Sequence, residues 1–348
     1  MQAQKGSRRW LRFVAYNLAA VSLGIAVGLA VVAFAGGNIG HALYTLLTSP
    51  VTTSAGVQQV FVRFVILYSI GLGVGLALKA GLWNVGGQGQ LVIGMVMVFV
   101  VYTVARSLAW PLLFVLFLVA GAVGGLLWIT VPALLKTKFG ANEIVVTLLL
   151  NIVASNFGLY MLNGPIRSSH SPGYPITDTL PTNLRIPNII PGIGITYAVP
   201  MVVAIGVVLY FLVERTSFNV EANTVGASTE TARYAGVSVT NVTVICMLGA
   251  GALAGLGGAL LVMGFLYHLD AGQFSTNYGL LAIIVALLGR KSMLGIGVAS
   301  VFFGYISIGA EQMAVAVNVQ TSVVTAMEGV MLLGVLFSSY LQASGHRR

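Results

Sequence analysis

The residues best suited to bind a ligand are three amides in one glycine-rich segment. Asn84, Gln88 and Gln90 lie in AGLWNVGGQGQL, residues 80–91, among four glycines and a tryptophan. Each amide can donate and accept hydrogen bonds, which suits sugar hydroxyls or the edges of nucleobases. So many glycines make a poor helix, and irregular backbone inside a membrane is tolerated where it lines a cavity or is buried in protein. The segment predicts a site for a small polar solute; the alternative is a glycine-rich helix start packed against a neighbour.

Other polar residues fall inside apolar runs. Asn151 and Asn156 are candidates for the same pathway, although polar side chains also hold helices together in membranes. Arg63 and Glu328 are ionisable groups at membrane depth, where each costs roughly 2.5–3.5 kcal/mol on insertion scales. We expect these two to pair or to line an outer vestibule jointly. The alternatives are that Arg63 extends to the interface while Glu328 faces a wet cavity alone, or that Glu311 is the partner.

Residues for catalysis or metal binding are missing from the sequence. No G-x-x-x-x-G-K-[ST] phosphate loop, H-E-x-x-H motif or G-x-S-x-G motif occurs. The chain has four scattered histidines, eight acidic residues and one cysteine, Cys246, within an apolar run. We therefore predict no catalytic residue, no metal site and no cofactor bound by this chain, and an intramembrane enzyme is disfavoured.

Composition places these residues in a membrane protein. Of 348 residues, 57% are hydrophobic and only 7% are charged, whereas soluble domains carry about 25% charged residues. Apolar runs of about 20 residues are typical of helices that cross a hydrocarbon core about 30 Å thick. The 43 glycines predict close helix–helix contacts. The net charge of +9 comes from short basic clusters between apolar runs, which argues against nucleic acid as a partner.

The apolar runs predict an all-α polytopic protein of the cytoplasmic membrane with about ten transmembrane helices, some of them broken or short. The predicted spans are 14–35, 57–78, 84–104, 110–134, 143–162, 197–213, 241–263, 279–289, 293–312 and 321–340. The eighth, 279–289, is too short to cross alone at about 1.5 Å per residue. It is expected to extend upstream or to form a broken or half-crossing helix.

Lysine and arginine predict the orientation of these spans. If the N-terminus is cytoplasmic, most of the 17 lysines and arginines lie on the inner side, and only Arg106, Arg167 and Arg185 lie on the outer side. Both termini are therefore predicted to be cytoplasmic. This gives an N-terminal tail at 1–13, one transmembrane domain at 14–340 and a C-terminal tail at 341–348.

Two loops of this domain are long. The outer loop, 163–196, is rich in proline and is expected to form an irregular cap. The inner loop, 214–240, is the longest polar stretch on the cytoplasmic side, and its length favours contact with a partner outside the membrane. The alternative is a solvated connector.

Four segments together resemble a known family. GLWNVGGQGQ, residues 81–90, resembles the G-L-[FW]-N-[IV]-G-x-[EQ]-G-Q pattern of permease subunits of nucleoside and simple-sugar ABC importers, a group related to the ribose permeases. Residues 141–157, 223–239 and 278–296 are similar to three further patterns of that family, in the same order. Gln88 stands where the family usually has Glu, and Ala227-Ser228 replaces the usual Asn-Pro.

The resemblance implies a non-catalytic translocation subunit. Two permeases, a homodimer or a pair of paralogues, would form the pathway for a nucleoside or a simple sugar. Two ATPase subunits would bind ATP and Mg²⁺ and dock on the inner loop, and an external solute-binding protein would deliver the solute. The docking residues implied are Gly226, Ala227, Ser228, Thr229, Arg233, Tyr234 and Gly236.

A stand-alone carrier driven by an ion gradient is the alternative function. Such a carrier needs buried carboxylates for its coupling ion, and Glu328 is the candidate deep in a predicted span. The long inner loop would then have no task. The sequence leaves open which solute is carried and whether the second permease is a copy or a paralogue.

Overall fold

The computed structural model describes residues 2–171, 173–190 and 192–344. Within this part of the chain, eight helices are long and apolar enough to cross a membrane, and a ninth span results if a helix pair bent by 76° is counted. The contacts divide the chain into two compact units. The first takes in the described residues up to Val60 and from Val301 onward, and the second is Phe61–Ser300.

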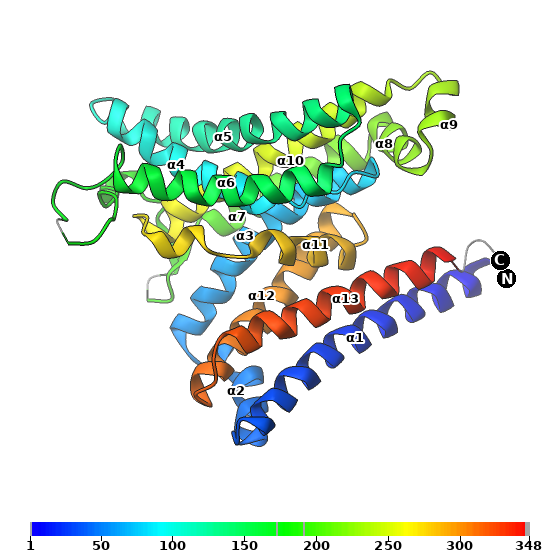
Figure 1. The fold of residues 1–348 in the computed structure, drawn as a ribbon, viewed down its shortest axis with the longest axis horizontal. Coiled ribbons are helices and arrows are strands. Elements are labelled where there is room, and N and C mark those ends of the chain that lie inside the picture. The colour runs from blue at the N-terminus through cyan, green and yellow to red at the C-terminus, as the bar shows by residue number, and fades with distance from the viewer. Residues whose placement is uncertain (1, 172, 191, 345–348) are drawn as a thin grey trace. The chain divides into compact units, whose positions relative to one another are not determined.

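The first unit brings the two ends of the chain together. Helices α1 (Gln2–Phe34) and α13 (Ser322–Ser344) lie side by side and antiparallel (Figure 1). Methionines of α13 pack against glycines of α1: Met331 contacts Gly24, and Met327 contacts Gly28. Small residues therefore allow this pair to approach closely.

Helix α2 also belongs to the first unit and is not among the predicted spans. It runs Ile39–Thr52, and the Asn38 side chain caps it by accepting from the His41 amide at 3.0 Å. Fourteen residues are too few to cross a membrane at about 1.5 Å rise per residue. Its apolar run is therefore too short to be predicted as a span, although Asn38 is a residue type that favours the start of a helix.

The second unit is a helical bundle with an irregular cap. Its elements, with α3 and α12 extending into the first unit, are α3 (Ser54–Lys79), α4 (Gly87–Ala105), α5 (Trp110–Phe139), α6 (Glu143–Asn163), η1 (Thr182–Leu184), β1 (Asn188–Ile190), β2 (Ile195–Thr196), α7 (Ala198–Leu209), η2 (Tyr210–Glu214), α8 (Ser217–Ala227), α9 (Thr229–Tyr234), α10 (Val239–Leu261), η3 (Val262–Leu266), η4 (Ala271–Phe274), α11 (Tyr278–Leu288) and α12 (Met293–Ala316). Helix α4 packs against α5, α6, α10 and α11. It is therefore the element that organises the site.

Helices α5 and α10 meet along a seam of glycines. A Cβ added to Gly125 would lie 2.8 Å from Gly255 Cα, and one added to Gly255 would lie 2.8 Å from Gly125 N. Backbone stands against backbone here, so only glycine fits. The close contacts expected from the glycine content are confirmed at this seam.

The proline-rich outer loop is irregular, as expected, and contains the small antiparallel hairpin β1–β2. It is fastened to the segment that follows α10: Thr177 N donates to Leu269 O at 3.1 Å, and Leu180 N donates to Tyr267 O at 2.8 Å. The Arg185 guanidinium lies 4.6 Å from the ring centre of Tyr267. The loop therefore covers the residues that lead into η4 and α11.

All ten predicted spans coincide with helices, and the all-α polytopic fold is confirmed. Helix α11 has only 11 residues, as the short run 279–289 indicated, and it is preceded by η4 rather than extended upstream as one long helix. The sixth span ends in π-helical η2 and bends before α8. The described part of the segment 1–13 continues α1 as helix. The orientation of the termini stays a prediction, and residues 345–348 of the predicted C-terminal tail lie outside the described residues.

Candidate functional site

A cavity of about 360 Å³ lies inside the second unit. The start of α4, the middle of α6 and the segment from η4 to α11 form its walls. Its lining residues are Val85, Gln88, Leu148, Asn151, Ile152, Ser155, Asn156, Phe274, Ser275, Thr276, Asn277, Gly279 and Leu280. None of them is charged, so the cavity suits an uncharged ligand with polar groups.

Gln88 is the amide best placed to bind a ligand in this cavity. Its side chain is 5% exposed, and its Nε2 donates to Thr276 Oγ1 at 2.7 Å. The other end of the amide, Oε1, is buried and has no hydrogen-bond partner among the described residues. A buried acceptor without a partner costs roughly 1–3 kcal/mol. A ligand that donates an N–H or O–H group here would remove that cost.

Asn151 and Ser155 hold the walls of the cavity together. Asn151 Nδ2 donates to Val85 O at 2.9 Å, and its Oδ1 accepts from Gly89 N at 2.8 Å. Ser155 Oγ donates to Phe274 O at 2.8 Å. Because Asn151 and Ser155 are four residues apart, they lie on one face of α6, and they bond this face to the start of α4 and to the end of η4.

Asn84 and Gln90, two further predicted pathway residues, do not line the cavity. Asn84 Nδ2 donates to Gln90 Oε1 and Gln90 Nε2 donates to Asn84 Oδ1, both at 3.0 Å. Both side chains are buried. Asn84 Oδ1 also accepts from Gly86 N at 3.0 Å. This amide pair supports the non-helical segment before α4 from within.

The remaining predicted pathway residues are dispersed. Asn156 lines the cavity from an exposed position, and its Nδ2 donates to Ile152 O at 2.8 Å. Arg63, in the second unit, lies 4.8 Å from the ring centre of Tyr278. Glu328, in the first unit, accepts from Ser307 Oγ at 2.8 Å. Pairing of Arg63 with Glu328 stays a prediction.

The polar residues 275–277 were missed by sequence reasoning. They line the cavity together with Phe274, and Thr276 accepts the hydrogen bond of the Gln88 amide. A signal was present in the sequence, because a polar run stands directly before an apolar run too short to cross. Such an arrangement is typical of an interrupted helix at a solute site.

The inner loop forms two short helices at one end of the second unit. Ser228 Oγ accepts from Thr231 N at 3.2 Å and caps α9, and Gly236 closes it with φ +76°. Arg233 is exposed, and Tyr234 is 94% exposed. An exposed arginine and tyrosine are residue types that protein interfaces favour.

Helix α8 of this loop rests on the end of α3. A Cβ on Gly226 would lie 2.8 Å from Gly81 N and would also collide with the Lys79 carbonyl. A polar cavity of about 600 Å³ lies beside this contact; Ala227, Ser228, Thr229 and Arg233 are among its lining residues. The inner loop is therefore packed against the bundle and presents a recessed, polar face.

Comparison with known proteins agrees with this architecture. Residues 56–337 match the family described as branched-chain amino acid transport system / permease component. The glucose ABC transporter permease protein of Haloferax volcanii is 33% identical over 85% of this chain and 80% of its own length. The guanosine ABC transporter permease protein of Bacillus subtilis is 30% identical over 93% of this chain and 92% of its own. A nucleoside ABC transporter permease protein of Lactococcus lactis is 27% identical over 70% of this chain and 68% of its own length.

The family match covers most of the chain, and the two relatives at 30% identity or more align over at least four fifths of their own length. With eight long apolar helices among its described residues, the protein is a multi-pass membrane protein. The chain belongs to the family of permease components of ABC transport systems.

Proposed function

We propose that this chain forms the pathway of an ABC importer for an uncharged, polyhydroxylated solute, with nucleosides as the first choice and simple sugars as the second. The observation that supports this proposal most directly is the cavity without charged lining residues, in which one polar end of the Gln88 amide has no partner in the described part of the chain. Its volume of about 360 Å³ falls within the usual range of small-molecule sites. The names of the relatives, which include guanosine, nucleoside and glucose permeases, support the same class.

Permeases of this family work with ATPase and solute-binding partners. For this chain we infer two ATPase subunits, a second permease that is a copy or a paralogue, and an external solute-binding protein. ATP and Mg²⁺ would be bound by the ATPases alone, and both termini would lie in the cytoplasm. The docking surface would be the inner loop 214–240, where Arg233 and Tyr234 are exposed.

Reconstitution of the complete transporter tests the proposal. The complex with its ATPase and solute-binding subunits is placed in sealed vesicles, and uptake of radiolabelled guanosine, uridine, ribose, glucose and leucine is measured with and without ATP. We expect saturable, ATP-dependent uptake of a nucleoside or a sugar and none of leucine, because a zwitterion has no charged partner in the cavity. Preferred uptake of leucine would contradict the solute class. Uptake by the chain alone under an ion gradient would contradict the coupling to ATPases.

A further inference from the structure

Glu214 stands at the break in the sixth span and has no role in the cavity or on the exposed docking face. It is the last residue of η2, before the chain bends by 76° into α8. Its side chain is only 14% exposed. Holding a carboxylate away from water is costly unless its partners are well placed, so the contacts of Glu214 indicate what it does.

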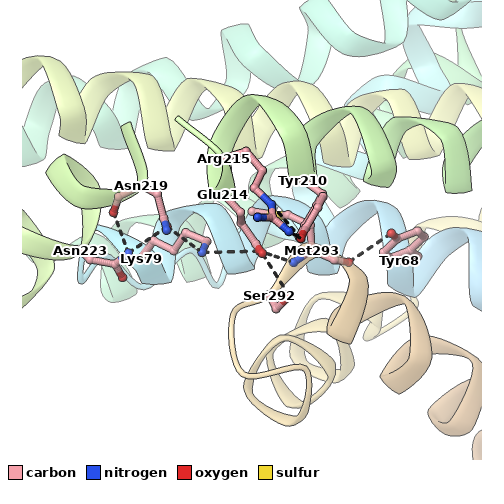
Figure 2. A network of polar contacts seen from close by, with 9 residues as sticks. All are labelled: Tyr68, Lys79, Tyr210, Glu214, Arg215, Asn219, Asn223, Ser292 and Met293. Carbon is pink, nitrogen blue, oxygen red and sulfur yellow. Dashed lines mark hydrogen bonds and ion pairs between the residues drawn. The ribbon is translucent and has the colours of Figure 1, made fainter. Parts of the chain in front are cut away.

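The carboxylate of Glu214 binds the start of α12, as Figure 2 shows. Its Oε1 accepts from the backbone N–H of Met293, the first residue of α12, at 2.6 Å, and its Oε2 accepts from Ser292 Oγ at 3.3 Å. The first N–H groups of a helix have no partner within the helix, and a negative charge there is favoured by the helix dipole. Glu214 therefore caps a helix that begins 79 residues further along the chain.

The same carboxylate is connected to α3 and α8 through Lys79. Lys79 Nζ lies 3.6 Å from Glu214 Oε1 and donates to Asn219 Oδ1 at 3.1 Å. Lys79 is itself only 8% exposed. We call Lys79, Glu214, Asn219, Ser292 and Met293 the Glu214 clamp (Figure 2). It joins the C-terminus of α3, the inner loop and the N-terminus of α12.

The turn between α11 and α12 is tightly held on the clamp's side. Arg290 and Lys291 both have left-handed φ values, 54° and 60°, and Lys291 Nζ donates to Leu78 O at 2.8 Å. Burial, and then the positive charge of Lys79, lowers the pKa of the Lys291 ammonium. Gly289 stands against the backbone of Ile296, where a Cβ would not fit. A turn packed in this way has little room to deform between Met293 and the end of α11.

The other end of α11 lies in the wall of the solute cavity. Gly279 and Leu280, in its first turn, line the cavity, as does Thr276, which accepts from Gln88. Helix α11 has 11 residues, about 16 Å at 1.5 Å rise. A rigid helix of this length joins the turn held by the clamp to the residues that contact the ligand.

We propose that Glu214 is a positioning residue that makes the inner loop and α11 move together, so that movement of the docked inner loop opens and closes the solute cavity. The inference rests on the proposed coupling role of the inner loop. A cap with a purely structural role would affect stability alone. If the proposal is right, removal of the carboxylate lowers the amount of solute taken up for each ATP that is hydrolysed.

The test uses the reconstituted complex with Glu214→Ala, Glu214→Gln and Lys79→Met. Solute uptake and ATP hydrolysis are measured in the same vesicles. With Glu214→Ala, solute taken up per ATP should fall about tenfold, because a charged hydrogen bond of this kind contributes enough free energy for that ratio. Glu214→Gln keeps an acceptor for the Met293 amide and should recover part of the loss. Lys79→Met should give an intermediate loss.

Tyr210→Phe is the matched control. The Tyr210 hydroxyl, in the same turn of η2, accepts from Arg215 Nε at 2.9 Å and makes no bond to the clamp. Its loss should leave uptake per ATP unchanged. An equal loss of uptake per ATP in Tyr210→Phe and in Glu214→Ala would overturn the proposal, because any disturbance of η2 would then be enough to lower the coupling.

Hydrogen exchange gives a second readout. In the wild-type complex, a non-hydrolysable ATP analogue should change amide exchange in peptides covering residues 274–289, and this change should be absent in Glu214→Ala and reduced in Glu214→Gln. If Glu214→Ala does not assemble, Glu214→Gln and Lys79→Met provide the same comparison. Normal uptake per ATP together with a normal exchange response in Glu214→Ala would overturn the proposal, even if the thermal stability of that variant falls.

The double variant Arg233→Ala with Tyr234→Ala separates this inference from the proposed function. Uncoupling in that variant but not in Glu214→Ala would refute the clamp and leave docking intact. Absence of ATP-dependent uptake in the wild-type complex would refute the proposed function itself.

Discussion

The three amides of the segment 80–91 have different surroundings despite their similar chemistry. Asn84 and Gln90 bond each other twice and are buried, whereas Gln88 bonds Thr276 at one end and has no partner at its other end among the residues that the structure describes. A satisfied buried amide pair stabilises a fold, and an unsatisfied amide beside a cavity is free to recognise a ligand. Two amides that bond each other and one proposed ligand-binding amide therefore alternate within seven residues.

Replacing Gln88 by Leu should impair binding more than folding. The variant removes the acceptor that faces a ligand, and we expect KM for uptake to rise about tenfold, the equivalent of one hydrogen bond of roughly 1.4 kcal/mol. The thermal stability of the purified complex should change little, because the cost of the unpartnered Oε1 is removed together with the bond to Thr276, a half-buried residue whose hydroxyl can bind water instead. Uptake kinetics in vesicles check the first point, and an unchanged KM would remove Gln88 from the solute site.

Replacing Gln90 by Leu should have the opposite effect. The substitution leaves both polar ends of the Asn84 side chain without Gln90, and we expect a loss of about 1–3 kcal/mol of stability. Thermal unfolding in detergent measures this loss. The protein that remains folded should have a KM for uptake close to that of the wild type. A stable protein with a raised KM would assign Gln90 to the pathway instead.

At the scale of elements, glycine content determines how closely helices pack. The seam between α5 and α10 places backbone against backbone at Gly125 and Gly255. The predicted spans located these helices, because apolar runs of about 20 residues have one dominant explanation in a membrane protein. Helix α2 and the bend before α8 depend on caps and on packing, which apolar runs do not report.

Gly255→Ala tests the seam. Its Cβ would lie 2.8 Å from Gly125 N, so the helices must separate, and we expect about 1–3 kcal/mol of destabilisation from overpacking. Gly329→Ala in α13 is the matched control, since a Cβ there meets nothing within 4 Å. The melting temperature of Gly255→Ala should be lower than that of Gly329→Ala. Equal melting temperatures would show that α5 and α10 tolerate a wider spacing.

At the scale of the whole molecule, the proposed docking surface and the proposed solute cavity are separate sites, and the proposed function requires them to communicate. The cavity is formed by α4, α6 and the segment before α11, whereas Arg233 and Tyr234 lie on exposed positions of α9. The Glu214 clamp is a polar connection between the inner loop and α12.

Arg233→Ala combined with Tyr234→Ala should weaken assembly. We expect at least about tenfold less ATPase subunit to co-purify, since exposed arginine and tyrosine commonly dominate interface energies. Arg106→Ala combined with Tyr160→Ala is the matched control, because both residues are exposed and lie outside the inner loop. Undiminished co-purification of the Arg233 and Tyr234 variant would place docking elsewhere on the inner loop.

The sequence by itself determined that this is an all-α multi-pass protein, where its spans lie, and that its family is that of ABC permeases, because apolar length and local motifs are properties of short stretches of chain. Only the tertiary structure decided that Gln88 faces the cavity while Asn84 and Gln90 face each other. It alone revealed residues 274–277 as a cavity wall and brought Glu214 to the start of α12. These relations join residues far apart in the chain, and packing, which no local pattern encodes, selects the partner of each polar group.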